Sequence, residues 1–275
     1  MNILEKIIES KRKEVAERKV LAPVSALEKE AGFSRAVLSL RQSLVDPART
    51  GIIAEFKRRS PSKGVINDKV TVESVTKGYA AAGASCLSVL TDAEFFGGTS
   101  DDLRAARVNE IPILRKDFMI DEYQIVEARA MGADVILLIA ACLSREDVRR
   151  LARFAMSLGL EVLLEIHNEE ELGHICDETA LVGVNNRDLK TFTVDVERSI
   201  RLSKKIPAGK LLIAESGINE VATILHMKMA GFQGFLVGEH FMKEKDPGAA
   251  FGAFVRKLSG GQNLSGARDL SAGRN

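Results

Sequence analysis

Eight short apolar runs, separated by stretches with helical periodicity, constrain the fold of this chain more than any other feature. Stretches such as Ser144–Ser157 and Asn219–Met229 carry apolar residues at helical spacing. The apolar runs have the character of buried strands: Ile52–Phe56, Cys86–Leu90, Ile113–Arg115, Val135–Ile139, Val162–Ile166, Leu181–Val184, Leu211–Ala214 and Gly234–Val237. Strands that alternate with helices form parallel sheets through right-handed crossovers. We therefore predict the α/β class and a single (βα)8 TIM barrel; periodicity alone leaves a doubly wound sheet open as the alternative.

The segments on either side of these runs set the predicted domain boundaries. The chain has 275 residues, and a TIM barrel takes about 250. Before the first run, helical spacing predicts one helix that ends at Pro23 and a second over Ser25–Ser43. After the last predicted helix, Gly, Ser and Arg replace any apolar period. We expect an N-terminal helical extension over residues 1–47, a barrel catalytic domain over 48–258 and a disordered tail over 259–275.

Composition argues against several classes of partner. The 39 basic and 38 acidic side chains give a net charge of +1, which creates no overall field for nucleic acid or an anionic membrane. Aromatic residues make up 5% of the chain and include no Trp, which argues against a base-stacking platform. The longest apolar run, Val135–Leu143, is shorter than the roughly 20 residues that cross a membrane. We expect neither a nucleic-acid nor a membrane partner.

The cysteines and histidines point to no metal site and no disulfide. Cys86, Cys142 and Cys176 are widely spaced and form no C-x-x-C pair, which is typical of reduced thiols in the cytoplasm. The four histidines have no metal-binding spacing relative to the acids and cysteines. No G-x-G-x-x-G follows a predicted strand, so a nicotinamide cofactor is not expected. We expect a cytoplasmic protein that works without metal or cofactor.

Charged and polar side chains follow five of the predicted strands. They are Glu55, Lys57, Arg115, Lys116, Asp117, Glu165, Asn185, Arg187, Glu215 and Ser216. The chemistry of a TIM barrel takes place at the C-terminal ends of its strands, which meet at one mouth. A single Glu at such a place is structural or solvated about half the time, and Lys57 or Lys116 could serve as a salt-bridge partner of Glu55 or Glu165. Five strands with the same feature at the same end favour an active site.

Two glycines and one basic loop indicate that the site takes an anion. Gly217 and Gly238 follow the seventh and eighth predicted strands, where barrels commonly bind phosphate through backbone N–H groups. The segment Arg58–Gly64 follows the first strand. It is either an ordinary solvated loop or a mobile anion-binding loop with Gly64 as its hinge. Our hypothesis is that this loop closes over the bound substrate and shields the reaction from water.

Six motifs, in order along the chain, carry a resemblance to a known family. They are Ile53-Ala54-Glu55-Phe56-Lys57-Arg58-Arg59-Ser60-Pro61-Ser62, Ser88–Asp92 with Phe95–Gly98, Leu114–Asp121 with Tyr123–Ile125, Glu161–Ile166, Gly183–Leu189 and Ala214–Ile218. Together they resemble the indole-3-glycerol-phosphate synthases, and the similarity extends over roughly residues 1–255. The chain departs from the family at His240, where a small residue is more common.

The resemblance implies a carboxy-lyase of tryptophan biosynthesis. Its substrate is the phosphorylated small molecule 1-(2-carboxyphenylamino)-1-deoxy-D-ribulose 5-phosphate, and its products are indole-3-glycerol phosphate, CO2 and water. The resemblance makes Lys116 the general acid of ring closure, Glu165 the acid–base group of dehydration and Lys57 the ligand of the substrate carboxylate. The other implied roles are positioning by Glu55, Asn185 and Glu215, phosphate binding by Arg59, Ser216, Gly217 and Gly238, and substrate contacts by Ser60, Phe118 and Arg187. The oligomeric state is left open, with a monomer as the working expectation.

Two rival functions remain open at this point. Another phosphate-binding barrel, such as a phosphoribosyl isomerase, would share the glycines but not Lys57, Lys116 and Glu165 together. A non-catalytic barrel that only binds a phosphorylated ligand would have lost the catalytic positions. Incubation with the carboxyphenylamino substrate separates the three, because only a synthase generates indole fluorescence.

Overall fold

The computed structural model describes residues 3–188 and 191–269, so Leu189 of the motifs above and residues 270–275 of the predicted tail lie outside the described residues. Its centre is a closed barrel of parallel strands in which β1 pairs with both β4 and β10. The strands are β1 (Ile52–Phe56), β4 (Cys86–Leu90), β5 (Ile113–Lys116), β6 (Val135–Ile139), β7 (Glu161–Ile166), β8 (Leu181–Asn185), β9 (Leu211–Glu215) and β10 (Gly234–Val237). Closure confirms the predicted TIM barrel and excludes the doubly wound sheet.

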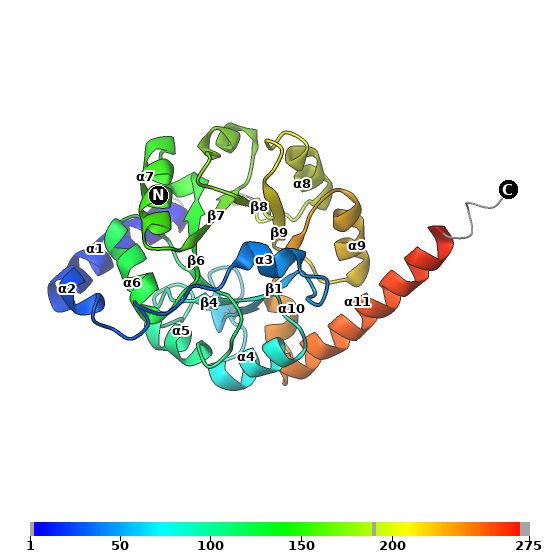
Figure 1. Cartoon of the computed structure of the whole chain (residues 1–275), viewed down its shortest axis with the longest axis horizontal. Helices are drawn as coiled ribbons and strands as arrows, with labels where there is room; N and C mark the ends of the chain where they lie inside the picture. Colours follow the sequence, from blue (N-terminus) through cyan, green and yellow to red (C-terminus); the bar gives the residue numbers. More distant parts are fainter. Residues whose placement is uncertain (1–2, 189–190, 270–275) are drawn as a thin grey trace.

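Helices surround the barrel and bury its outer face (Figure 1). In chain order they are α4 (Val72–Ala81), α5 (Ser100–Ala106), α6 (Glu122–Met131), α7 (Arg145–Ser157), α8 (Val196–Ser203), α9 (Val221–Met229), α10 (Glu239–Met242) and α11 (Pro247–Asp269). Short 3-10 turns, η1 (Ala140–Cys142) and η2 (Glu169–His174), follow β6 and β7. Gly78 of α4 and Gly248 of α11 let these two helices touch, because a Cβ on Gly78 would lie 2.8 Å from the Gly248 Cα.

The interior of the barrel is apolar at one end and polar at the other. Side chains at every second strand position point inward. Those nearer the N-terminal ends form one buried cluster: Ile53, Cys86, Leu114, Val135, Leu137, Leu163, Leu181, Ile213 and Leu236. One or two inward positions further along, the same strands carry Glu55, Lys116, Glu165, Asn185 and Glu215. The apolar layer therefore supports a polar mouth at the C-terminal ends of the strands.

The N-terminal extension differs from its prediction. It contains α1 (Ile3–Leu21), α2 (Val24–Leu27) and α3 (Leu40–Val45), so the single helix predicted over Ser25–Ser43 is wrong. Turns separate α2 from α3 because the intervening chain packs closely on the barrel: a Cβ on Gly32 would lie 2.1 Å from the Ala130 carbonyl oxygen. Leu40 and Leu44 of α3 join the interior cluster, and α3 therefore closes the N-terminal end of the barrel (Figure 1).

The last helix extends past the predicted start of the tail. Phe251, Phe254 and Leu258 anchor the first half of α11 in the core, and the helix continues to Asp269. Helix α11 therefore does not end at Leu258, because its hydrogen-bonded backbone continues beyond the residues that are buried in the core. The division of the chain at residues 47 and 258 into extension, catalytic domain and tail stays a prediction.

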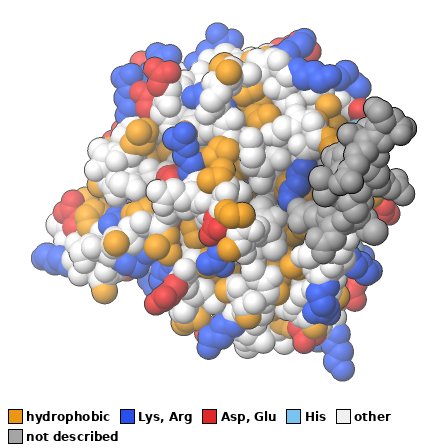
Figure 2. All heavy atoms as spheres, turned by 45° about the vertical axis from the view of Figure 1, so that its right-hand side comes forward, with side chains coloured by type: hydrophobic (Ala, Val, Ile, Leu, Met, Phe, Trp, Pro, Cys, Tyr) orange, Lys and Arg blue, Asp and Glu red, His pale blue; other side chains and the backbone are white. Residues whose placement is uncertain are grey.

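The surface carries both signs of charge (Figure 2). Basic and acidic side chains alternate over the face shown, with apolar side chains in small groups between them. In the described part of the chain, no helix is long and apolar enough to cross a membrane.

Candidate active site

A pocket opens at the polar mouth of the barrel and brings together the residues that the sequence predicted. All of the predicted site residues except Arg59 line it: Glu55, Lys57, Ser60, Lys116, Phe118, Glu165, Asn185, Arg187, Glu215, Ser216, Gly217 and Gly238. They come from the ends of β1, β5, β7, β8, β9 and β10 and from the loops that follow them. Their convergence follows from the parallel register, in which Glu165 pairs with Gly183 and Asn185 pairs with Glu215.

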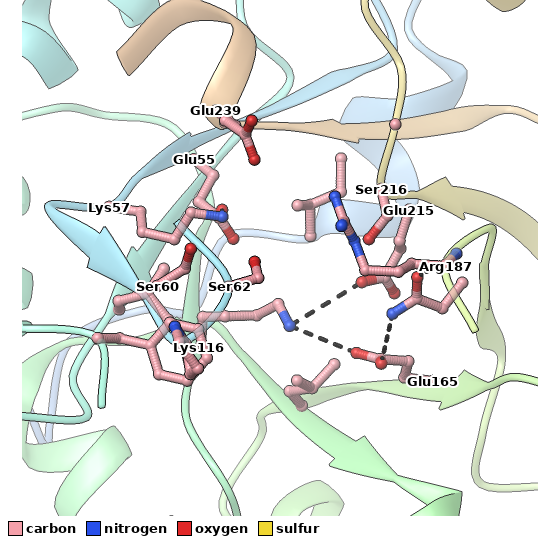
Figure 3. Close-up of a pocket in the computed structure, with 18 of the residues that line it drawn as sticks. Glu55, Lys57, Ser60, Ser62, Lys116, Glu165, Arg187, Glu215, Ser216 and Glu239 are labelled. Atoms are coloured by element: carbon pink, nitrogen blue, oxygen red, sulfur yellow. Dashed lines mark hydrogen bonds and ion pairs between the residues drawn. The ribbon is translucent and has the colours of Figure 1, made fainter. Parts of the chain in front are cut away.

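Lys116 lies at the centre of the pocket between two glutamates (Figure 3). Its Nζ is 3.3 Å from Glu165 Oε2 and 4.0 Å from Glu215 Oε2. Asn185 donates its Nδ2 hydrogen to Glu165 Oε1 at 2.9 Å. Both glutamates are buried, so a cation and two acids share one site in which the two carboxyl groups are largely removed from solvent.

The charges of this cluster shift one another's protonation. Burial alone would lower the pKa of Lys116, but the carboxylates of Glu165, Glu215 and Glu55 outweigh it and raise the pKa above its usual range. Burial acts to raise the pKa of Glu165, but Lys116, His167 and Asn185 together lower it well below its ordinary value. Burial and the neighbouring Glu165 raise the pKa of Glu215 to about 8. At neutral pH the cluster therefore holds an ammonium, a carboxylate and a neutral carboxylic acid.

Two glycines, which have no side chain, leave the space that the carboxyl groups of Glu215 and Glu55 occupy. A Cβ on Gly183 of β8 would lie 2.1 Å from Glu215 Oε1, and one on Gly238 would lie 2.5 Å from Glu55 Oε1. No side chain fits at such distances without displacing a glutamate. Gly238 therefore serves the site in two ways, since it also lines the pocket beside Ser216 and Gly217.

Lys57 forms a second pair within the pocket. Its Nζ lies 2.7 Å from Glu55 Oε1, and both residues belong to the same inward row of β1 and its extension, two positions apart. Lys57 keeps part of its side chain accessible, whereas Glu55 is buried. The ammonium of Lys57 can therefore reach an anionic ligand while Glu55 holds it in place.

The loop after β9 has an unusual backbone. Ser216 has φ of +67° and Gly217 has φ of +68°, and only glycine adopts that region without strain. The Ser216 carbonyl accepts a hydrogen bond from Asn186 Nδ2 at 2.9 Å, which holds the turn. Strained non-glycine residues cluster at ligand sites, and this one lies where barrels bind phosphate.

Arg59 does not reach the pocket. Arg59–Ser60 and Gly64–Val65 form a short hairpin, β2 and β3, and the Arg59 guanidinium donates to the carbonyls of Ala93 and Glu94. Its neighbour Arg58 is also engaged, since its Nη2 donates to Asp102 Oδ1 at 2.7 Å. The two guanidinium groups of this loop are therefore directed at α5 and at the segment between β4 and α5.

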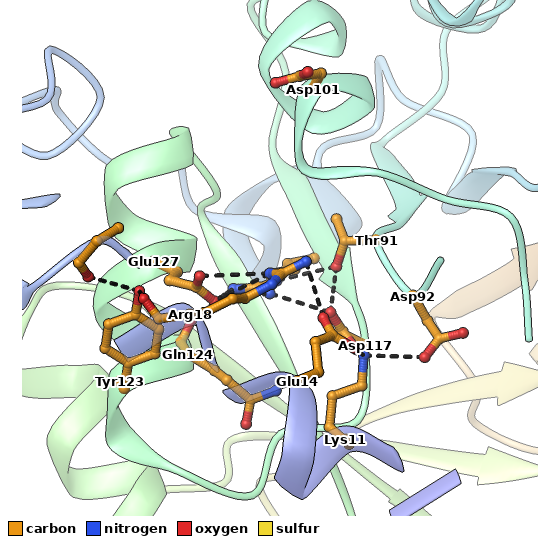
Figure 4. A network of polar contacts seen from close by, with 12 residues as sticks. Lys11, Glu14, Arg18, Thr91, Asp92, Asp101, Asp117, Tyr123, Gln124 and Glu127 are labelled. Carbon is orange, nitrogen blue, oxygen red and sulfur yellow. Dashed lines mark hydrogen bonds and ion pairs between the residues drawn. The ribbon is translucent and has the colours of Figure 1, made fainter. Parts of the chain in front are cut away.

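A buried ion-pair network supports Lys116 from outside the barrel (Figure 4). Arg115 and Asp117 flank Lys116 in the sequence, and Arg115 Nη2 lies 3.1 Å from Asp117 Oδ2. In Figure 4 the Asp117 carboxylate lies beside Lys11 and Thr91. Lys11 of α1 lies 2.9 Å from Asp117 Oδ1 and 3.0 Å from Asp92 Oδ2. Lys11 is 1% exposed. The network therefore joins α1 to the end of the strand that carries Lys116.

Several pocket residues were not predicted from the sequence. Apolar side chains of α1 (Ile3, Leu4 and Ile7) line the pocket, as do Phe96 and Phe192. The helical spacing of apolar residues in α1 predicted an apolar face but did not predict that this face lines the pocket. His167 was also missed, although its place two residues after Glu165 puts both on one side of the strand.

The fold and the site together define a TIM barrel whose C-terminal mouth gathers acids and cations around one pocket, the arrangement typical of an enzyme of this fold. The family described as indole-3-glycerol phosphate synthase matches residues 4–254. This chain belongs to that family.

Relatives support this assignment, and solved structures support the barrel fold. An indole-3-glycerol phosphate synthase of Bacteroides thetaiotaomicron is 46% identical over 258 residues, which cover 94% of this chain and 99% of the relative. One of Azospirillum brasilense is 44% identical, with 92% and 99% covered. Among solved structures, a mutant tryptophan synthase α-subunit of Pyrococcus furiosus gives a TM-score of 0.58 at 15% identity, over 77% of this chain and 99% of that chain. The 3-hexulose-6-phosphate synthase of Salmonella typhimurium gives 0.59 at 12%, over 75% and 97%. At these identities the structures show the barrel fold alone.

Proposed function

We propose how the residues of the mouth divide the reaction of this family among themselves. As an indole-3-glycerol phosphate synthase family member, the chain converts 1-(2-carboxyphenylamino)-1-deoxy-D-ribulose 5-phosphate into indole-3-glycerol phosphate, CO2 and water. The reaction closes a ring, loses a carboxylate and then loses a hydroxyl. Each step needs a proton delivered or removed, and none is a redox step.

Lys116 is the general acid of ring closure. The aromatic carbon of the substrate attacks the ribulose carbonyl, and Lys116 gives its proton to the oxygen that becomes negative. The observation that carries this role is the position of its ammonium between Glu165 and Glu215, at 3.3 and 4.0 Å. The raised pKa keeps the lysine protonated at neutral pH, as a general acid must be before it reacts.

Lys57 binds the carboxylate that leaves as CO2. Its ammonium is held by Glu55 at 2.7 Å and faces the same pocket as Lys116. When the carboxylate leaves, the electrons of its bond to the ring restore the aromatic system. Glu55 acts as a positioning residue, since it touches Lys57.

Glu165 serves dehydration. Because its pKa is low, it enters the reaction as a carboxylate that accepts a proton from the new ring. The same proton then passes from Glu165 to the hydroxyl, which leaves as water. Asn185 fixes one oxygen of Glu165 and leaves the other toward Lys116. Glu215, neutral below about pH 8, adds no second negative charge to this centre.

The remaining residues hold the two ends of the substrate. Ser216, Gly217 and Gly238 bind the phosphate, while Ser60, Phe118 and Arg187 contact the anthranilate end, all from the lining of one pocket. Arg59 can join the phosphate site only if its guanidinium leaves the carbonyls of Ala93 and Glu94.

The protein acts as a monomer in the cytoplasm. Every proposed site residue except Arg59 lines one pocket of a single barrel, so one copy of the chain can hold the proposed catalytic groups. Cys86, Cys142 and Cys176 are free thiols, as expected in a reducing compartment.

Two substitutions test the proposed roles. A positioned acid or base contributes about 10²–10⁴-fold to a rate, so Lys116→Ala and Glu165→Gln should each lower kcat by about that factor. Turnover is measured from indole fluorescence, and circular dichroism should show an unchanged fold. Near-wild-type turnover in either variant rejects the assignment of that residue.

A further inference from the structure

His167 lies beside the catalytic cluster but outside the pocket lining. It follows Glu165 by two residues, is 6% exposed, and its Nε2 lies 2.9 Å from Glu165 Oε1. Asn185 contacts the same oxygen. Glu165 Oε1 is thus occupied by two groups, and Oε2 alone faces Lys116.

The second ring nitrogen of His167 is held by another carboxylate. Nδ1 lies 3.2 Å from Glu171 Oε2, and the same oxygen accepts the backbone N–H of His167 at 2.7 Å. Asn168 Nδ2 donates to the other oxygen of Glu171 at 3.0 Å, while Asn168 Oδ1 caps η2. The 3-10 turn after β7 therefore holds the Glu171 carboxylate beside the ring of His167.

An imidazole with a carboxylate near each nitrogen is most stable as an imidazolium. The Nδ1–H of His167 donates to Glu171 Oε2, and Nε2 pairs with Glu165 Oε1 by charge. The other titratable groups nearby do not oppose this. Burial and the adjacent carboxylates raise the pKa of Cys142, so its thiol is neutral, and Lys116 contacts Glu165 through Oε2 rather than through Oε1. Burial alone would lower the pKa of His167, but the contacts with Glu165 and Glu171 raise it to about 10.

We propose that His167 is a positioning residue for catalysis: held by Glu171, it binds Glu165 Oε1 as an imidazolium, keeps the Glu165 carboxylate ionised and leaves Oε2 free for proton transfer. The inference rests on the proposed role of Glu165 and identifies the side chain that keeps the Glu165 carboxylate charged. His167 itself does not touch the substrate, so its removal should alter the pH dependence of turnover rather than KM.

The charge of His167 can be measured without any assay of activity. Long-range ¹H–¹⁵N spectra of protein labelled at histidine report whether each ring nitrogen carries a proton, and His167→Gln identifies the signal among the four histidines. At pH 8, where an ordinary imidazole with a pKa of about 6.5 is neutral, we expect both nitrogens of His167 to be protonated. A neutral ring at pH 8 overturns the inference.

The kinetic test compares three variants over pH 3–9, because the pKa of Glu165 lies well below its ordinary value of 4.5. An opposite charge beside a carboxylate lowers its pKa by about 1–3, so His167→Gln should move the acid limb of kcat upward by about one pH unit or more, with KM little changed. Glu171→Gln should move it in the same direction. His174→Gln is the matched control, because His174 lies in the same turn and contacts only the backbone carbonyls of Glu171 and Leu143.

The outcomes separate this inference from the proposed function. An acid limb in His167→Gln that coincides with that of the wild type and of His174→Gln overturns the role of His167 and leaves the catalytic roles intact. Wild-type turnover in Glu165→Gln removes the proposed role of Glu165, whatever the spectra show.

Discussion

At the scale of single residues, the site holds two buried glutamates whose pKa values are shifted in opposite directions. Glu165 and Glu215 are both buried in one pocket beside Lys116. His167 and Asn185 stabilise the charged form of Glu165, whereas Glu215 has neither contact and faces the charge of Glu165. Two carboxyl groups so close do not both ionise readily. The surroundings therefore favour the charged form of Glu165, which is the proposed base, and the neutral form of Glu215.

This division predicts the alkaline side of the pH profile. Glu215 is neutral below its pKa of about 8 and becomes negative above it, while Lys116, with its raised pKa, keeps its proton there. We expect kcat/KM to fall as pH rises through about 8, because a second negative charge appears beside Glu165. Glu215→Gln cannot ionise and should lack this fall. An identical alkaline limb in Glu215→Gln and wild type contradicts the assignment.

At the scale of elements, α1 lines one side of the mouth, and a buried lysine is one of the residues that hold it there. Lys11 is buried among Asp92, Asp117 and Glu14, and the same helix supplies Ile3, Leu4 and Ile7 to the pocket. The network continues through Arg115 to Glu127 of α6. Removal of Lys11 leaves buried carboxylates without one of their counter-charges.

We expect Lys11→Met to destabilise the fold strongly. Breaking a buried ion pair by removing one partner costs about 3–5 kcal/mol, and urea unfolding measures that loss. Lys13→Met is the matched control, because Lys13 lies on the same helix with its side chain 71% exposed; exposed changes usually stay within about 0.5 kcal/mol. Equal stabilities for the two variants would show that α1 is not held by Lys11.

The loop after β1 is the second element with a testable motion. Lys63 has a half-exposed side chain whose Nζ lies 3.8 Å from Glu239, and Glu239 and Ser62 both line the pocket. If the loop closes over the substrate, a substrate analogue should slow tryptic cleavage at Arg58, Arg59 and Lys63. Cleavage at the exposed Lys205, which follows α8 outside the pocket lining, serves as the internal control. Equal rates at Lys63 with and without saturating analogue favour the ordinary solvated loop.

Elements that follow from the local spacing of apolar residues could be predicted from the sequence. Those that depend on contacts between residues far apart in the chain could not. The strands of the barrel follow from apolar runs, and the polar residues at their ends follow from the rule that parallel strands share one mouth. The break between α2 and α3 depends on the fit of Gly32 against Ala130 of α6. Arg59 is drawn from the pocket by carbonyls more than thirty positions away. The contact between His167 and Glu171 exists only because a 3-10 turn replaces the helix expected after β7.

At the scale of the whole molecule, stability and chemistry occupy opposite ends of the barrel. The N-terminal end is filled by apolar side chains and closed by Leu40 and Leu44 of α3. The C-terminal end carries Lys57, Lys116 and the glutamates in one pocket. The face shown in Figure 2 mixes charges of both signs. The match to the indole-3-glycerol phosphate synthase family over residues 4–254 separates the protein from an isomerase barrel or a binding protein.

The most direct test of the account follows the order of the steps with enzyme in excess over substrate labelled at its carboxylate. Lys116→Ala should slow both CO2 release and indole formation by about 10²–10⁴-fold, because it blocks ring closure. Glu165→Gln should release CO2 at close to the wild-type rate while indole fluorescence appears about 10²–10⁴-fold more slowly, because only dehydration is impaired. Equal slowing of CO2 release and indole formation in Glu165→Gln, or wild-type CO2 release in Lys116→Ala, would contradict the division of the reaction between these two residues.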